Sequence, residues 1–149
     1  MVGNLVNDAV RGPFARRPAP AGGVSREPGS GTILGGEPTL HPRYEDTIRL
    51  AGQLGYEHVI TTSNGLRPAR RKFARLQPND FAYVQISPDG GSPATHDVVR
   101  GPGTFDETME TVGEPAQRGF DTRIICTVNK ANQGDCLADL AADAPAVHA

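Results

Sequence analysis

TILGGEPTLHP (residues 32–42) is the stretch that decides the fold, because within it a strand gives way to the start of a helix. Thr32-Ile33-Leu34 is a short β-branched and apolar run, typical of a strand end, and Gly35-Gly36-Glu37-Pro38 comes directly after it. Past Pro42, apolar side chains recur at helical spacing and predict a helix with one buried face. That face consists of Tyr44, Ile48, Ala51 and Leu54.

The same alternation of strand and helix continues along the chain. The patterns predict strands over 58–61, 81–86 and 122–128, and helices over 68–76, from Thr104 onward, and over 134–142. Thr104 to Glu107 has the form of a capping box, and we expect Gly113 and Pro115 to interrupt the helix that it opens. This order predicts the α/β class, with a parallel sheet covered by helices and right-handed crossovers.

Residues 1–30 lack this alternation. Gly-Pro, Gly-Gly and Pro-Gly pairs recur there and break any regular element that could begin. We therefore expect 1–30 to be a disordered or aberrant N-terminal segment and 31–149 to form one domain, which the length of the chain allows.

Composition and charge argue against several classes of protein. The formal net charge is -2 and the pI about 6.1, so nothing global favours nucleic acid or a membrane surface. No apolar run reaches the roughly 18 residues of a membrane-spanning helix, and residues 1–10 do not have the form of a secretory signal. Two cysteines, Cys126 and Cys136, do not make a disulfide framework. We expect a cytoplasmic protein.

Four of the strands end in polar or glycine-rich motifs. These are Gly35-Gly36-Glu37-Pro38, Thr62-Ser63-Asn64-Gly65, Ser87-Pro88-Asp89-Gly90 and Thr127-Val128-Asn129. Because the carboxyl ends of parallel strands lie on one face, where ligands bind, these motifs predict one small site. Each motif taken alone is also what an ordinary turn between strand and helix contains.

The first motif has the chemistry of an ammonium site. Adjacent glycines let a ligand approach the backbone, their carbonyls accept hydrogen bonds, and Glu37 adds a carboxylate. A phosphate would instead need N–H donors, and neither GxxxxGK[ST] nor GxGxxG occurs. The four histidines show no metal-ligand spacing. The motif therefore favours the ammonium of an amino acid.

Together the motifs resemble the radical SAM superfamily, and most closely the branch that shares a core with the sulfatase-maturing and molybdenum-cofactor enzymes. LGGEPTLHP (34–42) is similar to the family's methionine-binding motif, and TTSNG (61–65) to its third-strand motif. QISPDG (85–90) resembles the fourth-strand motif, and HD (96–97) with RGPGTF (100–105) resembles the family's segment after that strand. The resemblance covers about residues 32–142.

This resemblance implies that S-adenosylmethionine (SAM) is held at these motifs and cleaved reductively, to start radical chemistry on an unknown small-molecule or peptide substrate. Gly35, Gly36 and Glu37 would hold the ammonium of SAM, and Ser87 with its neighbours would contact the carboxylate or ribose. The implied cofactor-binding residues are Gly35, Gly36, Glu37, Pro38, Asn64, Ser87, Asp89 and Arg100. A reductant protein is also implied, and no catalytic residue is assigned.

The chain departs from the family pattern at the iron–sulfur cluster. The family holds a [4Fe–4S] cluster on CxxxCxxC after its first strand, but no cysteine precedes Gly35. We expect Cys126 and Cys136 to be buried packing residues and assign no metal ligand. The expected architecture for 31–149 is a partial (β/α) barrel of about four parallel strands with outer helices. The first βα unit is missing, one strand edge is exposed, and we expect the chain as given to be incomplete or inactive.

Three alternatives remain open. One is a SAM-binding or scaffold protein without radical chemistry. Another is an RNA-contacting module that uses the basic segment 67–75, although a solvated outer face is the simpler interpretation of those charges. A Ser-His-Asp hydrolase built from Ser87, His96 and Asp97 has no GxSxG motif to support it.

Overall fold

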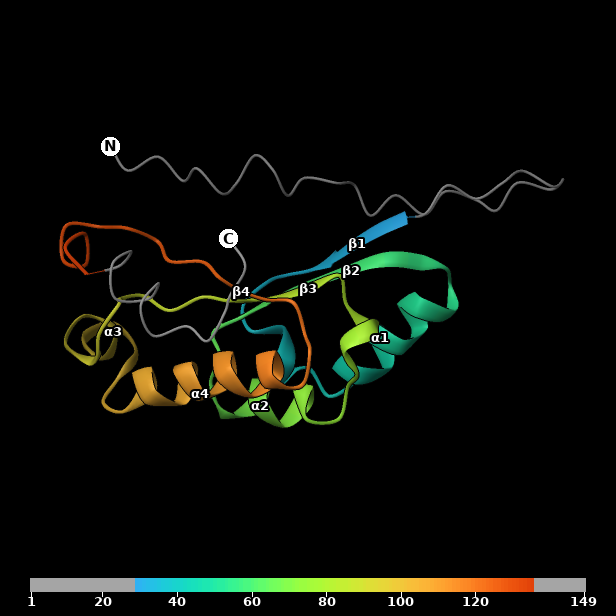
Figure 1. Cartoon of the computed structure of the whole chain (residues 1–149), viewed down its shortest axis with the longest axis horizontal. Coiled ribbons are helices and arrows are strands. Elements are labelled where there is room, and N and C mark those ends of the chain that lie inside the picture. Colours follow the sequence, from blue (N-terminus) through green and yellow to red (C-terminus); the bar gives the residue numbers. More distant parts are fainter. Residues whose placement is uncertain (1–28, 136–149) are drawn as a thin grey trace, which may run out of the picture.

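A computed structural model describes residues 29–135 of the chain (Figure 1). Three expectations lie wholly or partly outside these residues: the disordered segment 1–30 up to residue 28, the helix over 134–142 beyond residue 135, and the packing of Cys136. Within the described part, the first strand begins at Gly29. Residues 29 and 30 therefore belong to a strand and not to the disordered or aberrant segment expected for 1–30.

One four-stranded parallel sheet forms the centre of the fold. Its strands are β1 (Gly29–Ile33), β2 (Tyr56–Ser63), β3 (Tyr83–Ile86) and β4 (Thr122–Ile124). They pair in the order β1-β2-β3-β4, so each strand lies beside its neighbours in the chain. Parallel pairing of successive strands requires a crossover after each one, which confirms the expected α/β class.

The crossovers contain four helices and two short 3-10 turns. The helices are α1 (Tyr44–Gln53), α2 (Arg67–Phe73), α3 (Pro93–Arg100) and α4 (Thr104–Gln117), and the turns are Pro38–Leu40 and Pro78–Asp80. Figure 1 shows α1, α2 and α4 on the same side of the sheet. Helices on one side of a sheet with sequential strand order are the arrangement of a (β/α) barrel, whereas doubly wound folds cover both faces. The partial-barrel prediction is confirmed.

Apolar burial between the sheet and these helices holds the layers together. Val59 and Val84 point from the strands toward Ile48 of α1 and Phe73 of α2, all of them 3% exposed or less. The rings of Phe73, Phe81 and Phe120 meet with centroids 6.0–6.4 Å apart. Of the face expected for the first helix, Tyr44 and Ile48 are buried, but Leu54 is 56% exposed because the helix ends at Gln53.

Two expectations about helices are wrong. The helix α3 was not expected, since its buried residue is His96 and its two valines, Val98 and Val99, are exposed. The helix α4 continues through Gly113 and Pro115 to Gln117. Proline has no N–H to donate to the carbonyl of Thr111 and costs about 3 kcal/mol inside a helix, and burial of Pro115 offsets part of that cost.

The sheet ends at β1 on one side, and this edge borders apolar surface. A cavity of about 420 Å³ lies between β1 and α1, lined by side chains that include Leu50, Leu54 and Tyr56. Among residues 29–135, no strand pairs with the outer edge of β1, which agrees with the exposed edge that the sequence predicts, and the neighbours of this edge are apolar, of the kind that favours association. In the described residues, no helix combines the length and apolar character needed to cross a membrane.

Candidate functional site

The loop after β1 requires glycine for conformational reasons. Gly35 has φ +106° and Gly36 has φ +50°, both in the region that disfavours side chains. A Cβ atom at either position would meet nothing within 4 Å, so crowding does not explain the glycines. Both residues are exposed, and within residues 29–135 neither carbonyl accepts a hydrogen bond. Two adjacent carbonyl acceptors in this exposed loop are therefore without a partner among the described residues.

Glu37 fixes this loop to the end of the neighbouring strand. Its Oε1 accepts hydrogen bonds from the Thr39 N–H (3.1 Å), the Thr39 hydroxyl (2.5 Å) and the Ser63 hydroxyl (2.9 Å). Its Oε2 accepts from the Asn64 N–H at 2.7 Å. Pro38, buried at the start of the 3-10 turn, stiffens the chain just after Glu37. The carboxylate thus joins the ends of β1 and β2.

Glu37 Oε2 accepts one hydrogen bond, whereas Oε1 accepts three, so Oε2 is the less crowded of the two carboxylate oxygens. This oxygen and the carbonyls of Gly35 and Gly36 are three acceptors in one loop. An ammonium group has three donors and no acceptor. The loop therefore fits the ammonium group of an amino acid, as its residue types predict.

The ends of β2 and β3 are joined through Ser63. Its carbonyl accepts from the Ser87 N–H (2.9 Å) and the Ser87 hydroxyl (3.1 Å). Asn64 Oδ1 accepts from the Leu66 N–H at 3.0 Å, which closes a local turn. The amide nitrogen of Asn64 has no protein partner among the described residues and can donate to a ligand.

Asp89 organises the loop between β3 and α3. Its carboxylate forms an ion pair with Arg100, its N–H donates to Nδ1 of His96 (3.0 Å), and its carbonyl accepts from Asn132 (2.7 Å). Three separate segments are therefore held at one residue. The Asp89 carboxylate is paired with Nε of Arg100, whereas the other N–H groups of the exposed Arg100 remain available as donors. Direct contact with a ligand is therefore more favoured for Arg100 than for Asp89.

His96 and Asp97 have structural partners that rule out a Ser-His-Asp arrangement with Ser87. The Ser87 hydroxyl donates to the carbonyl of Ser63, and His96 accepts from Asp89. Asp97 accepts from the N–H groups of Gly103 (2.7 Å) and Phe105 (2.8 Å) and so caps α4. Burial would raise the pKa of Asp97, but these hydrogen bonds outweigh it and lower that pKa. This cap replaces the capping box expected at Thr104.

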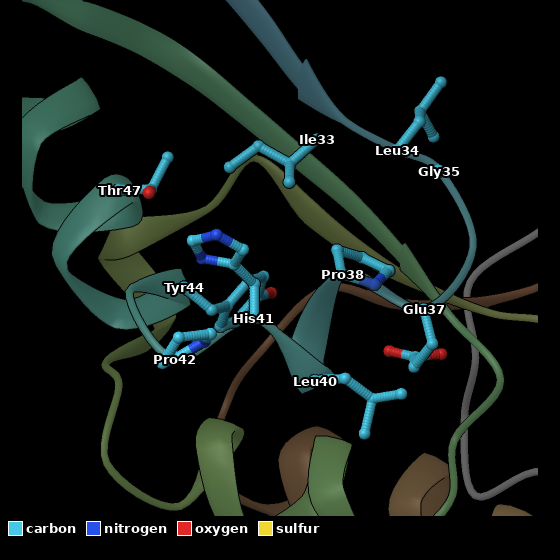
Figure 2. A pocket seen from close by; sticks show the side chains of 10 residues that line it. All are labelled: Ile33, Leu34, Gly35, Glu37, Pro38, Leu40, His41, Pro42, Tyr44 and Thr47. Carbon is cyan, nitrogen blue, oxygen red and sulfur yellow. The ribbon is translucent and has the colours of Figure 1, made fainter.

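A cavity of about 600 Å³ adjoins the first of the four motifs. Figure 2 shows Gly35 and Glu37 on one side of it and Thr47 of α1 on the other. Tyr44 lines it too, donates to Thr61 (3.1 Å), and has its pKa raised by burial, so the phenol stays protonated. Asn64, Ser87, Asp89 and Arg100 do not line it. The candidate residues therefore lie along an open end of the sheet, beside this cavity.

Close to the fourth motif lies a buried residue, Asn132, that the sequence analysis does not single out. Asn129 is an exposed turn residue whose Oδ1 accepts from the Ala131 N–H (2.8 Å). Asn132, 1% exposed, is the residue that bonds to Asp89 and Thr127. Sequence reasoning also missed Ser63, although the alternation of β2 places that side chain on the buried face together with Val59 and Thr61.

The described residues do not fit an iron–sulfur cluster. Within 29–135, no three or more His, Cys, Asp or Glu side chains gather as a metal site. Cys126 is half-buried, packs near Phe105 and is disulfide-bonded, so it differs from the buried packing residue that we expected. A cubane needs several thiolates, and this part of the chain offers none close to Gly35.

The basic segment 67–75 is largely neutralised by acidic neighbours. Arg70 forms ion pairs with Glu110 and Glu114 of α4, and the hydrogen bonds that Arg70 donates to the Glu114 carboxylate raise the pKa of Arg70. Lys72 and Arg75 pair with Glu45, and Arg67 with Glu107. These ion pairs join α2 to its neighbours, and they favour the interpretation of segment 67–75 as a solvated outer face over that of an RNA contact.

Comparison with known proteins gives a family for this fold and site. A family model described as "Radical SAM superfamily" matches residues 29–141. The chain is 36% identical over 111 residues to mycofactocin maturase MftC of Mycobacterium ulcerans, an alignment that covers 74% of this chain and 30% of the relative.

Two further relatives carry different names. The sporulation killing factor maturation protein SkfB of Bacillus subtilis is 31% identical over 102 residues, which are 68% of this chain and 24% of the relative. The AdoMet-dependent heme synthase of Nitratidesulfovibrio vulgaris is 29% identical over 101 residues, with shares of 67% and 27%. The chain thus spans less than a third of the length of these relatives.

Proposed function

This chain belongs to the radical SAM superfamily, and we propose on that premise that residues 29–135 seat the amino-acid end of SAM at the carboxyl ends of β1 to β3. Members of the family use SAM and a [4Fe–4S] cluster. The observation that carries the proposal is the pair of unpartnered carbonyls at Gly35 and Gly36 beside the anchored Glu37. Three acceptors in one loop match the three donors of the SAM ammonium.

The other proposed contacts depend on which donors are not already used. The amide nitrogen of Asn64 and the exposed guanidinium of Arg100 are donors that suit the carboxylate of SAM. Ser87 donates to Ser63, so it contacts SAM as an acceptor, for example from a ribose hydroxyl. Asp89 acts through Arg100, and Pro38 acts by fixing the turn that holds Glu37.

The described residues offer contacts for SAM, but they do not fit a [4Fe–4S] cluster. We derive no electron-transfer step from this chain. In the whole enzyme the proposed activity is reductive cleavage of SAM and radical chemistry on a small-molecule or peptide substrate, with a reductant protein. As given, the 149-residue chain is proposed to bind SAM without cleaving it. A cytoplasmic location is part of the same proposal.

The experiment that tests the SAM site is calorimetry on two variants of Gly36. Valine is strongly disfavoured at φ +50°, whereas asparagine tolerates this region, so only Gly36→Val should distort the loop. We expect Gly36→Val to lose about tenfold or more in SAM affinity, equivalent to ~1.4 kcal/mol, while Gly36→Asn stays close to the wild type. Circular dichroism controls for folding. Equal affinity of the wild type and Gly36→Val would rule out this site.

The second candidate function is SAM binding without radical chemistry, as in a scaffold protein. The absence of a thiolate group among residues 29–135 favours it. Both candidates predict SAM binding by this chain, and they differ only in whether the whole protein holds a cluster on residues outside 29–135, which its content of iron and sulfide measures.

A further inference from the structure

We propose that His96 is a positioning residue for SAM: its uncharged ring locks the loop between β3 and α3, and with it the Asp89–Arg100 pair, in the form that receives the ligand. This inference rests on the proposed SAM site and adds a residue and a pH dependence to it.

The hydrogen bond at His96 determines which tautomer the ring adopts. Nδ1 accepts from the Asp89 N–H at 3.0 Å, so Nδ1 carries no proton and the proton of the neutral ring lies on Nε2. The residue is 1% exposed, and Phe105 of α4 packs edge-on against it, with ring centroids 5.7 Å apart. Nε2 is buried and has no hydrogen-bond partner among residues 29–135. Within these residues, the hydrogen bond that anchors the ring is the one from the Asp89 backbone.

The loop that this anchor holds has no room to move toward α3. A Cβ atom added at Gly90 would lie 2.2 Å from the Thr95 hydroxyl and 2.7 Å from the backbone nitrogen of His96. Asn132 holds the same loop from the other side through the Asp89 carbonyl. With its backbone fixed at both sides, Asp89 presents its carboxylate to Arg100 in one direction.

Protonation of His96 would break this arrangement. A second ring proton on Nδ1 would face the Asp89 N–H, and two donors cannot share a hydrogen bond. The charged groups facing the ring are Asp89, Asp97 and Arg100; α4 contributes the apolar Phe105, and the segment around residue 132 contributes a neutral amide. Asp97 is already engaged with the amides of α4.

Burial lowers the pKa of His96 from its usual value of 6.5, and the nearby Asp89 and Asp97 oppose this only in part. The ring is therefore uncharged at neutral pH. The unfolded state takes up a proton on this residue at higher pH than the folded state does. The contribution of the uncharged His96 to the stability of the folded state is therefore present above about pH 6.5 and is lost as the pH falls below that value. SAM affinity should change in parallel, because only the locked fraction binds.

The test compares SAM binding at pH 7.5 and pH 5 by calorimetry on the full chain. His96→Asn is the matched variant, because its Oδ1 can accept from the Asp89 N–H and does not titrate, and His96→Leu removes the acceptor. We expect the wild type to lose affinity relative to His96→Asn as the pH falls from 7.5, by a factor of about ten for each pH unit below the lowered pKa of the ring. His96→Leu should bind weakly at both pH values. The same pH dependence in the wild type and His96→Asn would overturn the proposal, and this comparison cancels the titration of SAM itself.

A measurement without SAM separates this proposal from the proposed function. Nitrogen-15 NMR of the wild type should show Nδ1 unprotonated at pH 7.5, and the Asp89 amide signal should shift as the pH falls below 6.5. A protonated Nδ1 at pH 7.5, or an Asp89 amide signal that ignores pH, would contradict the locking role. If no variant binds SAM while the NMR result is as expected, the proposed function fails and the lock itself stands.

Discussion

Glu37 is the residue at which the fold and the candidate site depend on each other most. Four hydrogen bonds reach its carboxylate, two from Thr39 in its own turn and two from the end of β2. Oε2 accepts one of these four and is the less crowded oxygen for a further donor. A residue that closes a loop in this way holds the neighbouring carbonyls in place before any ligand arrives, which reduces the entropy lost on binding.

Replacing Glu37 with glutamine tests this double role at the scale of one residue. The amide keeps one acceptor oxygen, but its NH₂ group has to face donors from Ser63 or Asn64, which leaves a donor unsatisfied. We expect the free energy of unfolding to fall by about 1–3 kcal/mol in urea titrations, with a parallel loss of SAM affinity. The control is Glu57→Gln on the exposed start of β2, which should change neither quantity. An unchanged unfolding midpoint for Glu37→Gln would show that the four hydrogen bonds contribute nothing.

At the scale of elements, the order of the strands was predictable, but the ends of strands and helices were not: β4 ends at Ile124, although the sequence predicts a strand as far as residue 128. Alternation along 56–63 and 83–86 matches the buried positions of β2 and β3, and the parallel order is a consequence of the intervening helices. The helix α3 has no apolar stripe, since tertiary hydrogen bonds hold its buried His96. The cap of α4 comes from Asp97, on another helix, and local sequence rules do not reach that far.

The same limit applies to the candidate site. Its motifs could be predicted because parallel strands bring their carboxyl ends together, and the contacts from Glu37 to Asn64 and from Ser87 to Ser63 agree with this. Which side chain near a motif is buried depends on contacts with distant parts of the chain. The sequence therefore does not distinguish Asn132, which bonds to the Asp89 carbonyl, from Asn129, which bonds only within its own turn.

Two glycines, one in a loop and one in a helix, give the test at this scale. Gly65 lies just after β2 with φ +76°, and a Cβ atom there would lie 2.7 Å from Ile86 Cγ2 and 3.0 Å from Thr108 Cγ2. Gly65→Ala should therefore lower the free energy of unfolding by about 2 kcal/mol or more, from backbone strain and overlap together. Gly113 lies within α4 with nothing within 4 Å, and Gly113→Ala should raise it by about 0.5–1 kcal/mol. Urea titration of both variants measures the difference, and equal effects would contradict the assigned conformations.

At the scale of the whole molecule, the described residues form one sheet with helices on one side and the polar motifs at one end (Figure 1). The matched part covers 24–30% of the length of the named relatives. The residues proposed to contact SAM follow β1, β2 and β3, and all of them belong to the described part of the chain. Cluster ligands are a separate set of residues, and sequence and fold give no sign of that set between residues 29 and 135.

The last prediction concerns iron, and it applies to the chain as given. After reduction of its disulfide and anaerobic reconstitution with iron and sulfide, the 149-residue chain should hold no stoichiometric [4Fe–4S] cluster and make no 5′-deoxyadenosine from SAM. The reason is the ligand count: the sequence has two cysteines, one of which is half-buried beside Phe105 and remote in sequence from Gly35. Two thiolates do not replace the three of the family motif. Cys126→Ser is the control, because any adventitious iron that the wild type retains should persist in this variant. Near-stoichiometric iron and sulfide that depend on Cys126, together with 5′-deoxyadenosine, would instead make the chain an enzyme as it stands.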